Sequence, residues 1–578
     1  MKRISLYIFL ILFTLSIFLI SSHFVNPPAP TIYIAAGGCC ILAIVGIVQK
    51  YKQQIFSLSV TEVLVGAFLL FAVVNGVFSR SLNQEWIISG FSLFLLYLAV
   101  KRTKLTMEWL FAGLVFIGMA QAVYGLGQYL HWFMNIAAPS FRISGSFDNP
   151  AGFAAALSVC FPFALFFLRK KEMYWKIIGS LAAVLFIVAV ALSQSRAGVI
   201  ALLIVSGIWA IKALDIKWLN SWSSRTKIVG STVLIIAILV GLYAIKKNSA
   251  DGRLLIWQCS AHMIADKPLL GHGIGGFQRE YMLYQANYFR THPDSSFAML
   301  ADIVKQPFNE FLLLLVEHGL VGGLLWGIFV FILIRVYRRN KSLERFYAML
   351  CLVGMGVFAC FSYSMSYPFI RLMVVFCAAF IMRNEAGKWK IPKGLFSVLK
   401  PAVLIVSVAL LVLTMKMYQD EYRWNTIAQR SLAGETKKVL PDYARLYPWM
   451  NRNGLFVYNY AAELNYIGEW KQSNKLMTEC SRLYNDNDLQ LILADNCQQM
   501  KQYSEAEKHL KLAYEMIPNR LIPLYRLALL YKEEGKMNKA NQIARMIITK
   551  PVKIMSSDVL VIKSEMKELV VNKCKNIN

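Results

Sequence analysis

Apolar stretches and short polar connections alternate along roughly the first 416 residues of the chain. A helix of about 20 apolar residues crosses the hydrocarbon core of a bilayer, which is about 30 Å thick. The pattern predicts about 12–13 such helices and therefore an all-α, polytopic membrane bundle. The predicted spans are residues 5–22, 31–48, 57–78, 86–100, 108–130, 150–168, 177–193, 197–212, 228–245, 309–334, 346–366, 368–382 and 398–414.

The connections between these spans differ in charge on alternate sides of the membrane. With the N-terminus inside, the connections on its side are basic, as in "KRTK" (101–104) and "RVYRRNKSLER" (335–345). The opposite short connections, 23–31 and 79–85, carry at most one cation each. Because cytoplasmic loops are enriched in lysine and arginine, we expect the large loop 246–308 and the C-terminal region on the outer, periplasmic side.

The first span begins directly after the basic residues Lys2 and Arg3. A basic start followed by an apolar run is also typical of a signal peptide. No small-residue cleavage site follows the run, so we expect it to remain as the first of the spans.

Composition agrees with a membrane protein and narrows its partners. The chain is 57% hydrophobic and only 16% charged, whereas soluble domains are about one quarter charged. The formal net charge of +28 would suit nucleic acid, but the cations follow the inner connections, where lipid headgroups lie. Nucleic acid is therefore not an expected partner. The ten cysteines show no ligand spacing, and we predict neither a metal site nor a cofactor.

The C-terminal region repeats with a period of 33–34 residues between 457 and 551. Small residues recur at fixed offsets, as at Ala461, Ala494 and Ala528, and a proline closes the later units. This pattern resembles the tetratricopeptide repeat and predicts a short α-solenoid over 417–578, separate from the bundle of 1–416. The repeats are interpreted either as a spacer or as a docking surface for a protein partner.

Three arginines on the predicted outer side of the membrane flank spans or loops: Arg142, Arg196 and Arg253. A single arginine near the end of a span commonly snorkels to the headgroups. Three on the side that usually lacks cations favour a shared site. Guanidinium groups pair bidentately with phosphate oxygens, and the membrane-bound phosphates of that surface include diphosphate-linked lipid carriers of sugars. The arginines therefore predict binding of such a carrier.

Other polar residues accompany these arginines in the same outer-facing segments. A carboxylate or imidazole among them could accept a proton from an acceptor hydroxyl. The glycine-rich stretch 271–276 lacks the GK[ST] ending of a Walker loop and is interpreted as a turn. The histidine in this turn has a structural interpretation beside its binding one. The candidates for substrate binding or catalysis are Asn149, Ser195, His272, Asn309 and Glu310.

Four of these segments together resemble the superfamily of O-antigen ligases and O-antigen polymerases. They are "RISGSFDNPAGFAAAL", "LSQSRAGVIAL", "GRLLIWQCSAHMIADKPLLGHGIGGF" and "NEFLLLLVEHGLVGGLLWG". The similarity extends over roughly residues 60–385, and the order of the segments on one predicted side is its specific feature. The resemblance implies a glycosyltransferase of the bacterial inner membrane that transfers a glycan from undecaprenyl diphosphate and uses no metal.

The resemblance also implies residue roles. Arg196 and Arg253 become the pair that binds the carrier diphosphate, with Arg142 as a third candidate. Family members commonly have a histidine directly before the asparagine that opens the span after the loop, and this chain has Phe308 there. We favour Glu310 as the base that replaces it. His272 or another loop residue, different acceptor chemistry, or an inactive protein remain the alternatives.

Several functions stay open from the sequence. The leading hypothesis is transfer of a lipid-linked glycan to lipid A–core or to protein, and the repeats tilt it toward a protein acceptor or partner. Alternatives are an O-antigen or polysaccharide polymerase and a non-enzymatic polyprenyl-sugar transporter or flippase. The last would need polar residues through the bilayer midplane, where the spans are nearly all apolar. A non-catalytic anchor for the repeats would leave the outer arginines without a role.

Overall fold

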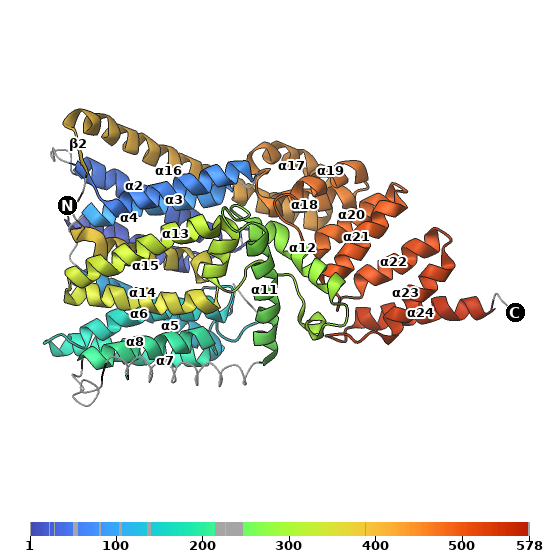
Figure 1. Ribbon diagram of the computed structural model, residues 1–578, viewed down its shortest axis with the longest axis horizontal. Helices are drawn as coiled ribbons and strands as arrows, with labels where there is room; N and C mark the ends of the chain where they lie inside the picture. The colour runs from blue at the N-terminus through green and yellow to red at the C-terminus, as the bar shows by residue number, and fades with distance from the viewer. Residues whose placement is uncertain are drawn as a thin grey trace.

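The chain folds into a helical bundle joined to a second helical region, as a computed structural model shows (Figure 1). It describes residues 2–21, 23–27, 29–49, 56–79, 83–102, 107–135, 140–213, 223, 226, 247–385, 387 and 389–575. The helix α11 (Lys247–Asp266) lies between the two parts. We call the end of the bundle next to α11 the loop end, and the other the strand end.

Twelve of the predicted spans coincide with helices, and the thirteenth, 228–245, lies outside the described residues. Nine helices of the described chain are long and apolar enough to cross a membrane, which supports a multi-pass membrane protein. The helices are α1 (Lys2–Phe18), α2 (Ala29–Gln49), α3 (Val60–Phe78), α4 (Gln84–Arg102), α5 (Met107–Tyr129), α6 (Pro150–Phe167), α7 (Met173–Leu192), α8 (Arg196–Ala213), α13 (Glu310–Arg339), α14 (Leu343–Phe361), α15 (Pro368–Ile381) and α16 (Lys393–Arg430).

Helix α6 forms the centre of the bundle. It packs against α5, α7, α8 and α14, and every residue from Gly152 to Phe167 is buried. A helix that is apolar on all sides belongs in such a core, and its run of small residues, Ala154–Ala156, lets neighbouring helices approach closely. Its N-terminus therefore has a fixed position at the loop end.

The strand end is held by a buried ion-pair cluster. Lys101 Nζ lies 3.4 Å from a carboxylate oxygen of Glu62 and 3.0 Å from one of Glu385. A guanidinium nitrogen of Arg102 lies 3.0 Å from the same Glu62 carboxylate. The cluster joins α3 and α4 to the chain after α15, beside the antiparallel strands β1 (Phe56–Leu58) and β2 (Trp389–Ile391). These charges compensate one another, so they stabilise the fold.

The loop between the bundle helices has its own hydrophobic core. It contains α11, α12 (Gly276–Thr291) and the 3₁₀ helix η1 (Ser296–Leu300). In the sequence, Leu254, Trp257, Ala261 and Ile264 recur at helical spacing and predict an apolar stripe on α11. This stripe is wrong by one position, since Leu254 is 46% exposed. The buried face instead runs through Leu255, Cys259 and Met263. Spacing alone cannot separate two adjacent faces of a short helix, and packing against α12 selects this one.

Helix α13 is broken at Gly319, where the glycine-rich turn docks. Gly319 has a φ of 60° and a ψ of −164°, a conformation that only glycine adopts readily. The backbone N–H groups of His272 and Gly273 donate to Val316 and Glu317 before the break, at 2.8 and 2.9 Å. The N–H of Leu320 donates to Pro268 after it, at 2.8 Å. The turn thereby satisfies polar groups that the break exposes within a span.

The C-terminal region begins within α16, which continues beyond the bundle. Successive helices pack against each other, and the small residues of the repeat pattern, such as Ala461, Ala494 and Ala528, are buried between them. The elements are η4 (Ser431–Glu435), α17 (Thr436–Met450), α18 (Gly454–Tyr466), α19 (Trp470–Cys480), α20 (Asn487–Gln499), α21 (Tyr503–Met516), α22 (Ile522–Glu533), α23 (Met537–Thr549) and α24 (Ser557–Lys575).

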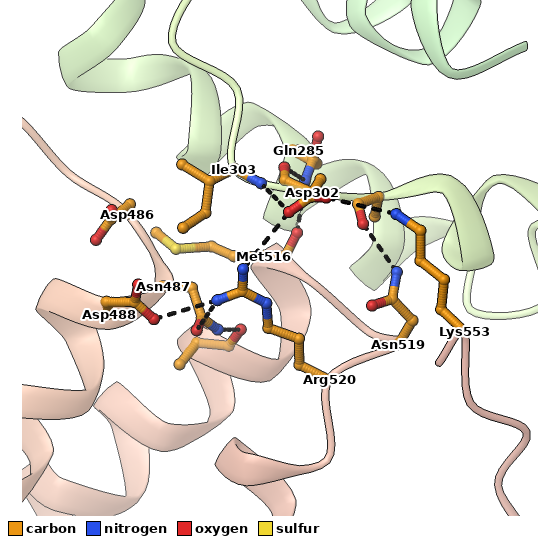
Figure 2. Close-up of polar contacts among 12 residues, drawn as sticks. Gln285, Asp302, Ile303, Asp486, Asn487, Asp488, Met516, Asn519, Arg520 and Lys553 are labelled. Carbon is orange, nitrogen blue, oxygen red and sulfur yellow. Dashed lines mark hydrogen bonds and ion pairs between the residues drawn. The ribbon is translucent and has the colours of Figure 1, made fainter. Parts of the chain in front are cut away.

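This region docks on the loop through apolar and polar contacts. Met516 and Ile517 are fully buried within the hydrophobic core of the loop. Around them, Gln285 Nε2 donates to the Met516 carbonyl at 2.7 Å (Figure 2). Arg520 reaches Asp302 of the loop at 3.5 Å and Asp488 of its own region at 3.2 Å. The C-terminal helices are thus fixed on the loop rather than tethered to it.

Candidate functional site

Arg253 lies in the first half of α11, at the loop end of the bundle. A guanidinium nitrogen donates to the carbonyl of Phe361 at 2.8 Å, and the guanidinium carbon lies 5.2 Å from the ring centre of Phe308. Burial and the nearby charge of Arg196 lower its pKa to about 10. Within the described chain no carboxylate forms an ion pair with Arg253. Its charge is therefore available to an anion.

Arg196 is the first residue of α8 and lies near Arg253. Its guanidinium donates to Ser249 Oγ, which precedes Arg253 by one turn of α11, at 3.1 Å. Ser195 Oγ accepts a hydrogen bond from the backbone N–H of Gly198 at 3.3 Å. Ser195 is buried and shapes the tight turn between α7 and α8. The structure thus brings the predicted arginine pair together and gives Ser195 a supporting position.

Asn149 and Asp148 face two tyrosines that the sequence did not single out. Asn149 Oδ1 caps α6 by accepting from the Gly152 N–H at 2.9 Å. Its amide donates to the hydroxyls of Tyr363 and Tyr367, and Tyr367 donates to Asp148 at 2.6 Å. The structure therefore adds Asp148, Tyr363 and Tyr367 to the site at the start of α6.

The tyrosines extend the cluster toward Arg253. The rings of Phe308 and Tyr363 lie 5.3 Å apart, and Phe308 is the ring that lies beside the Arg253 guanidinium. Burial and the Asp148 charge raise the pKa of Tyr363 to about 12. Desolvation raises the pKa of Asp148 as well, against the hydrogen bond from Tyr367. A carboxylate with a raised pKa beside a cationic pair is a candidate proton acceptor.

Arg142 stays apart from this cluster. Its side chain is exposed, and it forms no hydrogen bond or ion pair with other described residues. The nearby segment from Ile143 to Phe147 is buried against α5, where Gln128 accepts from the N–H groups of Ser144 and Gly145. The predicted third arginine thus lies at the loop end without a fixed position beside the other two.

Asn309 and Glu310 open α13 on the other side of Phe308. Asn309 Oδ1 caps the helix by accepting from the N–H groups of Phe311 and Leu312, at 2.9 and 3.1 Å. Glu310 accepts a hydrogen bond from the Met365 N–H at 2.7 Å. Phe308 has a φ of 54°, which is strained for a bulky residue. Asn309 therefore orients the helix start, and Glu310 remains the candidate acid–base residue.

His272 lies in the interior of the loop. Its ring is fully buried; Nδ1 lies 2.5 Å from a Glu280 carboxylate oxygen and Nε2 lies 2.8 Å from the Met263 carbonyl. Arg279 pairs with the same Glu280 carboxylate at 2.7 Å. Burial raises the pKa of Glu280, but hydrogen bonds from His272 and Arg279 overcome it and lower the pKa to about 2. This placement favours the structural interpretation of His272.

A cavity of about 1050 Å³ lies next to Glu310 and to Arg279 of the loop. Apolar residues of α13, α14 and α15 line its floor, while Arg279, Glu310, Glu317 and Arg371 line it near the loop end. Arg371 donates to Ser89 Oγ and to the Ser366 carbonyl, both at 2.9 Å. Of the predicted site residues that the structure describes, only Glu310 lines the cavity.

The end of α14 and the connection to α15 contact both the arginine pair and the cavity. Arg253 donates to the carbonyl of Phe361, the last residue of α14, and Glu310 accepts from the Met365 N–H in the connection. Within the described part of the chain, no group of three or more His, Cys, Asp or Glu side chains could hold a metal ion.

A comparison with known protein families found a match over the part of the chain that contains the arginine pair. Residues 181–327, from within α7 through the loop to Gly327 of α13, match the family described as "O-Antigen ligase". The matched part includes Arg196, Arg253 and Glu310. No curated protein matches the chain. The family match supports the O-antigen ligase superfamily and points to a membrane glycosyltransferase-like ligase, with a lipid-linked glycan and an acceptor as substrates.

Proposed function

We propose that the protein transfers a glycan from undecaprenyl diphosphate to an acceptor at the outer face of the bacterial inner membrane. One observation carries this proposal: Arg196 donates to Ser249 Oγ of α11 at 3.1 Å, one helical turn before Arg253, so the two guanidinium groups are neighbours. Two neighbouring guanidinium groups repel each other, and a diphosphate between them would remove that cost. The match to O-antigen ligases over the same residues supports a carrier diphosphate as the anion.

The reaction assigned to this site is a displacement at the anomeric carbon of the first sugar. The acceptor hydroxyl oxygen forms the new bond to that carbon, and the bond from the carbon to the diphosphate oxygen breaks. The hydroxyl proton passes to Glu310, and undecaprenyl diphosphate leaves with the bonding electrons. Arg196 and Arg253 stabilise the negative charge that develops on the leaving group, in place of a metal cation.

Asp148 is a second candidate for the proton acceptor. It is joined through Tyr367 and Asn149 to Tyr363, which lies beside the ring of Phe308. Glu310 instead faces the cavity. Both carboxylates contact the connection between α14 and α15, Asp148 through Tyr367 and Glu310 through Met365, but only Glu310 lines the cavity. Which of them serves as the base determines from which side the acceptor enters.

The proposal extends to topology and to the C-terminal region. The basic connections are expected on the cytoplasmic side of the membrane. We therefore assign the loop end to the periplasm. We assign residues 417–578 to a periplasmic tetratricopeptide-like solenoid, which favours a protein acceptor or partner over lipid A–core alone. A polysaccharide polymerase would use the same donor site with a glycan acceptor, and acceptor identity separates these two reactions.

Transfer by purified protein in proteoliposomes tests the proposal directly. The assay supplies an undecaprenyl-diphosphate-linked oligosaccharide and membrane extract as the source of acceptor. We expect Arg196→Ala and Arg253→Ala each to reduce the transfer rate at least about 100-fold, the loss typical of removing a stabiliser of developing charge. Wild-type transfer by both variants would refute the assignment. Lipid movement between leaflets without product would instead indicate a flippase.

A further inference from the structure

The C-terminal region forms part of the wall of the 1050 Å³ cavity, opposite the bundle helices. The wall contains the aromatic residues Trp449 and Tyr484 and the cations Arg452 and Arg482. Lys305 of the loop lines the cavity next to them, with its ammonium nitrogen 5.9 Å from the ring centre of Tyr484. These five residues are called the cationic wall below. The family match ends at residue 327, so most of this wall lies outside the matched part.

The cations of the wall are not compensated by carboxylates. Lys305, Arg452 and Arg482 are exposed, and none of them forms an ion pair with a described residue. The carboxylates that line the same cavity are already engaged. Glu85 faces Arg371, Glu310 accepts from Met365, Glu317 accepts from Gly275, Asp420 pairs with Lys416, and Glu421 accepts from Asn453. Among the described residues none of these carboxylates pairs with Lys305, Arg452 or Arg482, so the three cations at the opening keep no carboxylate partner.

The wall has a fixed position relative to the cavity floor. Figure 2 shows the reason: Arg520 bridges Asp302 of the loop and Asp488 of the C-terminal region, and Asn519 donates to the loop backbone. The Asn519 amide contacts the carbonyls of Ala298 and Ala301 at 2.9 and 2.8 Å. Because Met516 is also buried in the loop core, the wall is preorganised for a ligand rather than assembled around it.

The cavity therefore has two chemically different halves. Its floor between α13, α14 and α15 is apolar, as at Leu333, Leu352 and Val374, and suits a lipid chain. Its opening combines the three cations with the ring of Trp449, which is 58% exposed and has the Lys416 ammonium 3.9 Å from its centre, while Tyr484 is buried. Aromatic faces with a few convergent charged groups are typical of sites for polar ligands. Cations without carboxylate partners specify an anionic one.

We propose that the cationic wall binds acidic sugars, bearing carboxylate or phosphate groups, of a glycan that passes through this cavity. The inference rests on the proposed glycan transfer and names the substrate class of its sugar-binding side. The acidic sugar belongs either to the lipid-linked donor or to the acceptor. In both cases the C-terminal region takes part in substrate recognition beyond serving as a spacer.

Binding of two matched sugars to the full-length protein in nanodiscs tests this wall. The probes are a trimer of galacturonic acid and its carboxyl-reduced, neutral counterpart, with calorimetry as the measurement. We expect the acidic trimer to bind more tightly, and its affinity to fall as salt screens the exposed cations. The double variant Arg452→Gln/Arg482→Gln should weaken binding of the acidic trimer about tenfold, because each exposed charge pair contributes modestly.

The control is a second double variant that removes the same charge elsewhere in the C-terminal region. Arg445→Gln/Arg545→Gln changes exposed arginines that do not line the cavity, and it should bind both trimers as the wild type does. Lys305→Gln changes the loop side of the wall without touching the C-terminal helices, and it should weaken acidic binding even if the double variant misfolds. Equal affinity for both trimers, no binding of either, or unchanged binding by the wall variants would overturn the proposal.

Transfer kinetics then identify the source of the acidic sugar. A raised KM for the donor in the wall variants assigns it to the donor glycan, and a raised KM for the acceptor assigns it to the acceptor. Arg253→Ala lies outside the wall and should bind the trimers normally. Normal transfer by Arg253→Ala would contradict the proposed function. Equal or absent trimer binding, with transfer still lost in Arg253→Ala, would contradict only the proposed binding of acidic sugars.

Discussion

Two arginines on adjacent loop helices, Arg253 of α11 and Arg279 of α12, occupy opposite electrostatic environments. Arg279 pairs with Glu280 through two nitrogens, at 3.0 and 2.7 Å, and donates to the His272 carbonyl. Arg253 has a backbone carbonyl and an aromatic ring as its partners and a second arginine nearby. An arginine whose charge is paired with a carboxylate stabilises the fold. An arginine that lies beside a second cation favours binding of an anionic ligand. The contrast separates a structural cluster from a binding site within one loop.

Exchanging each arginine for lysine tests the contrast most directly. Arg253→Lys keeps the charge but loses the planar fork that binds two phosphate oxygens, so transfer should fall by about 10–100-fold with an unchanged melting temperature. Arg279→Lys should lower the melting temperature while the folded protein keeps its turnover. The measurements are transfer rate per folded molecule and thermal unfolding in detergent. The reverse outcome, with transfer lost only in Arg279→Lys, would exchange the two roles.

The next prediction separates the two carboxylates of the site. Glu310→Gln should reduce turnover by about 100-fold or more, the contribution typical of a general base, with little change in KM. Asp148→Asn keeps an oxygen that can accept the hydrogen bond from the Tyr367 hydroxyl but removes the charge. It should have the smaller effect on turnover. Turnover at saturating acceptor measures both. A greater loss in Asp148→Asn would move the base to the tyrosine side of the site, next to Arg253.

The break in α13 predicts a loss of stability when its glycine is replaced, because the loop that carries both arginines docks there. A Cβ atom on Gly319 would lie 2.3 Å from the Leu269 carbonyl oxygen, and its φ of 60° disfavours other residues. Gly319→Ala should therefore destabilise the protein by about 3 kcal/mol or more, since strain and a backbone clash add. Gly327→Ala in the same helix is the control, because nothing lies within 4 Å of its added Cβ. Equal melting temperatures for the two variants would contradict this account.

The sequence predicted the spans and the arginine pair because both depend on local chemistry. Apolar length decides whether a segment can cross a bilayer, and an arginine at an outer helix end is visible without knowledge of its neighbours. The break at Gly319 was not predicted, since it forms only when the turn at Pro268 docks on the helix from a distant segment. Nor were Tyr363 and Tyr367 singled out. Polar residues that interrupt the apolar run before Pro368 were the available signal for them.

The C-terminal region shows the same limit. The spacing of small residues such as Ala494 and Ala528 predicted paired helices here, and both residues are buried between neighbouring helices. The burial of Met516 and Ile517 in the loop core could not follow from that spacing, because it depends on a surface supplied by α11 and α12. The contribution of this region to the cavity wall is likewise a consequence of docking, and it appears only in three dimensions.

The smallest expected effect concerns acid stability of the structural cluster around Glu280. Its pKa is lowered from 4.5 to about 2 in the folded protein, so the ionised carboxylate stabilises the fold above the unfolded pKa. This contribution, roughly 1–3 kcal/mol, is lost as pH falls from about 4.5 toward 2. Glu280→Gln should lower the melting temperature at pH 7 and flatten its dependence on pH below 5. Among the residues that the structure describes, no carboxylate forms an ion pair with Arg253, so Arg253→Gln should keep the wild-type pH dependence. If instead Arg253→Gln flattened the curve as Glu280→Gln does, the two arginines would share one electrostatic environment and the contrast between them would be wrong.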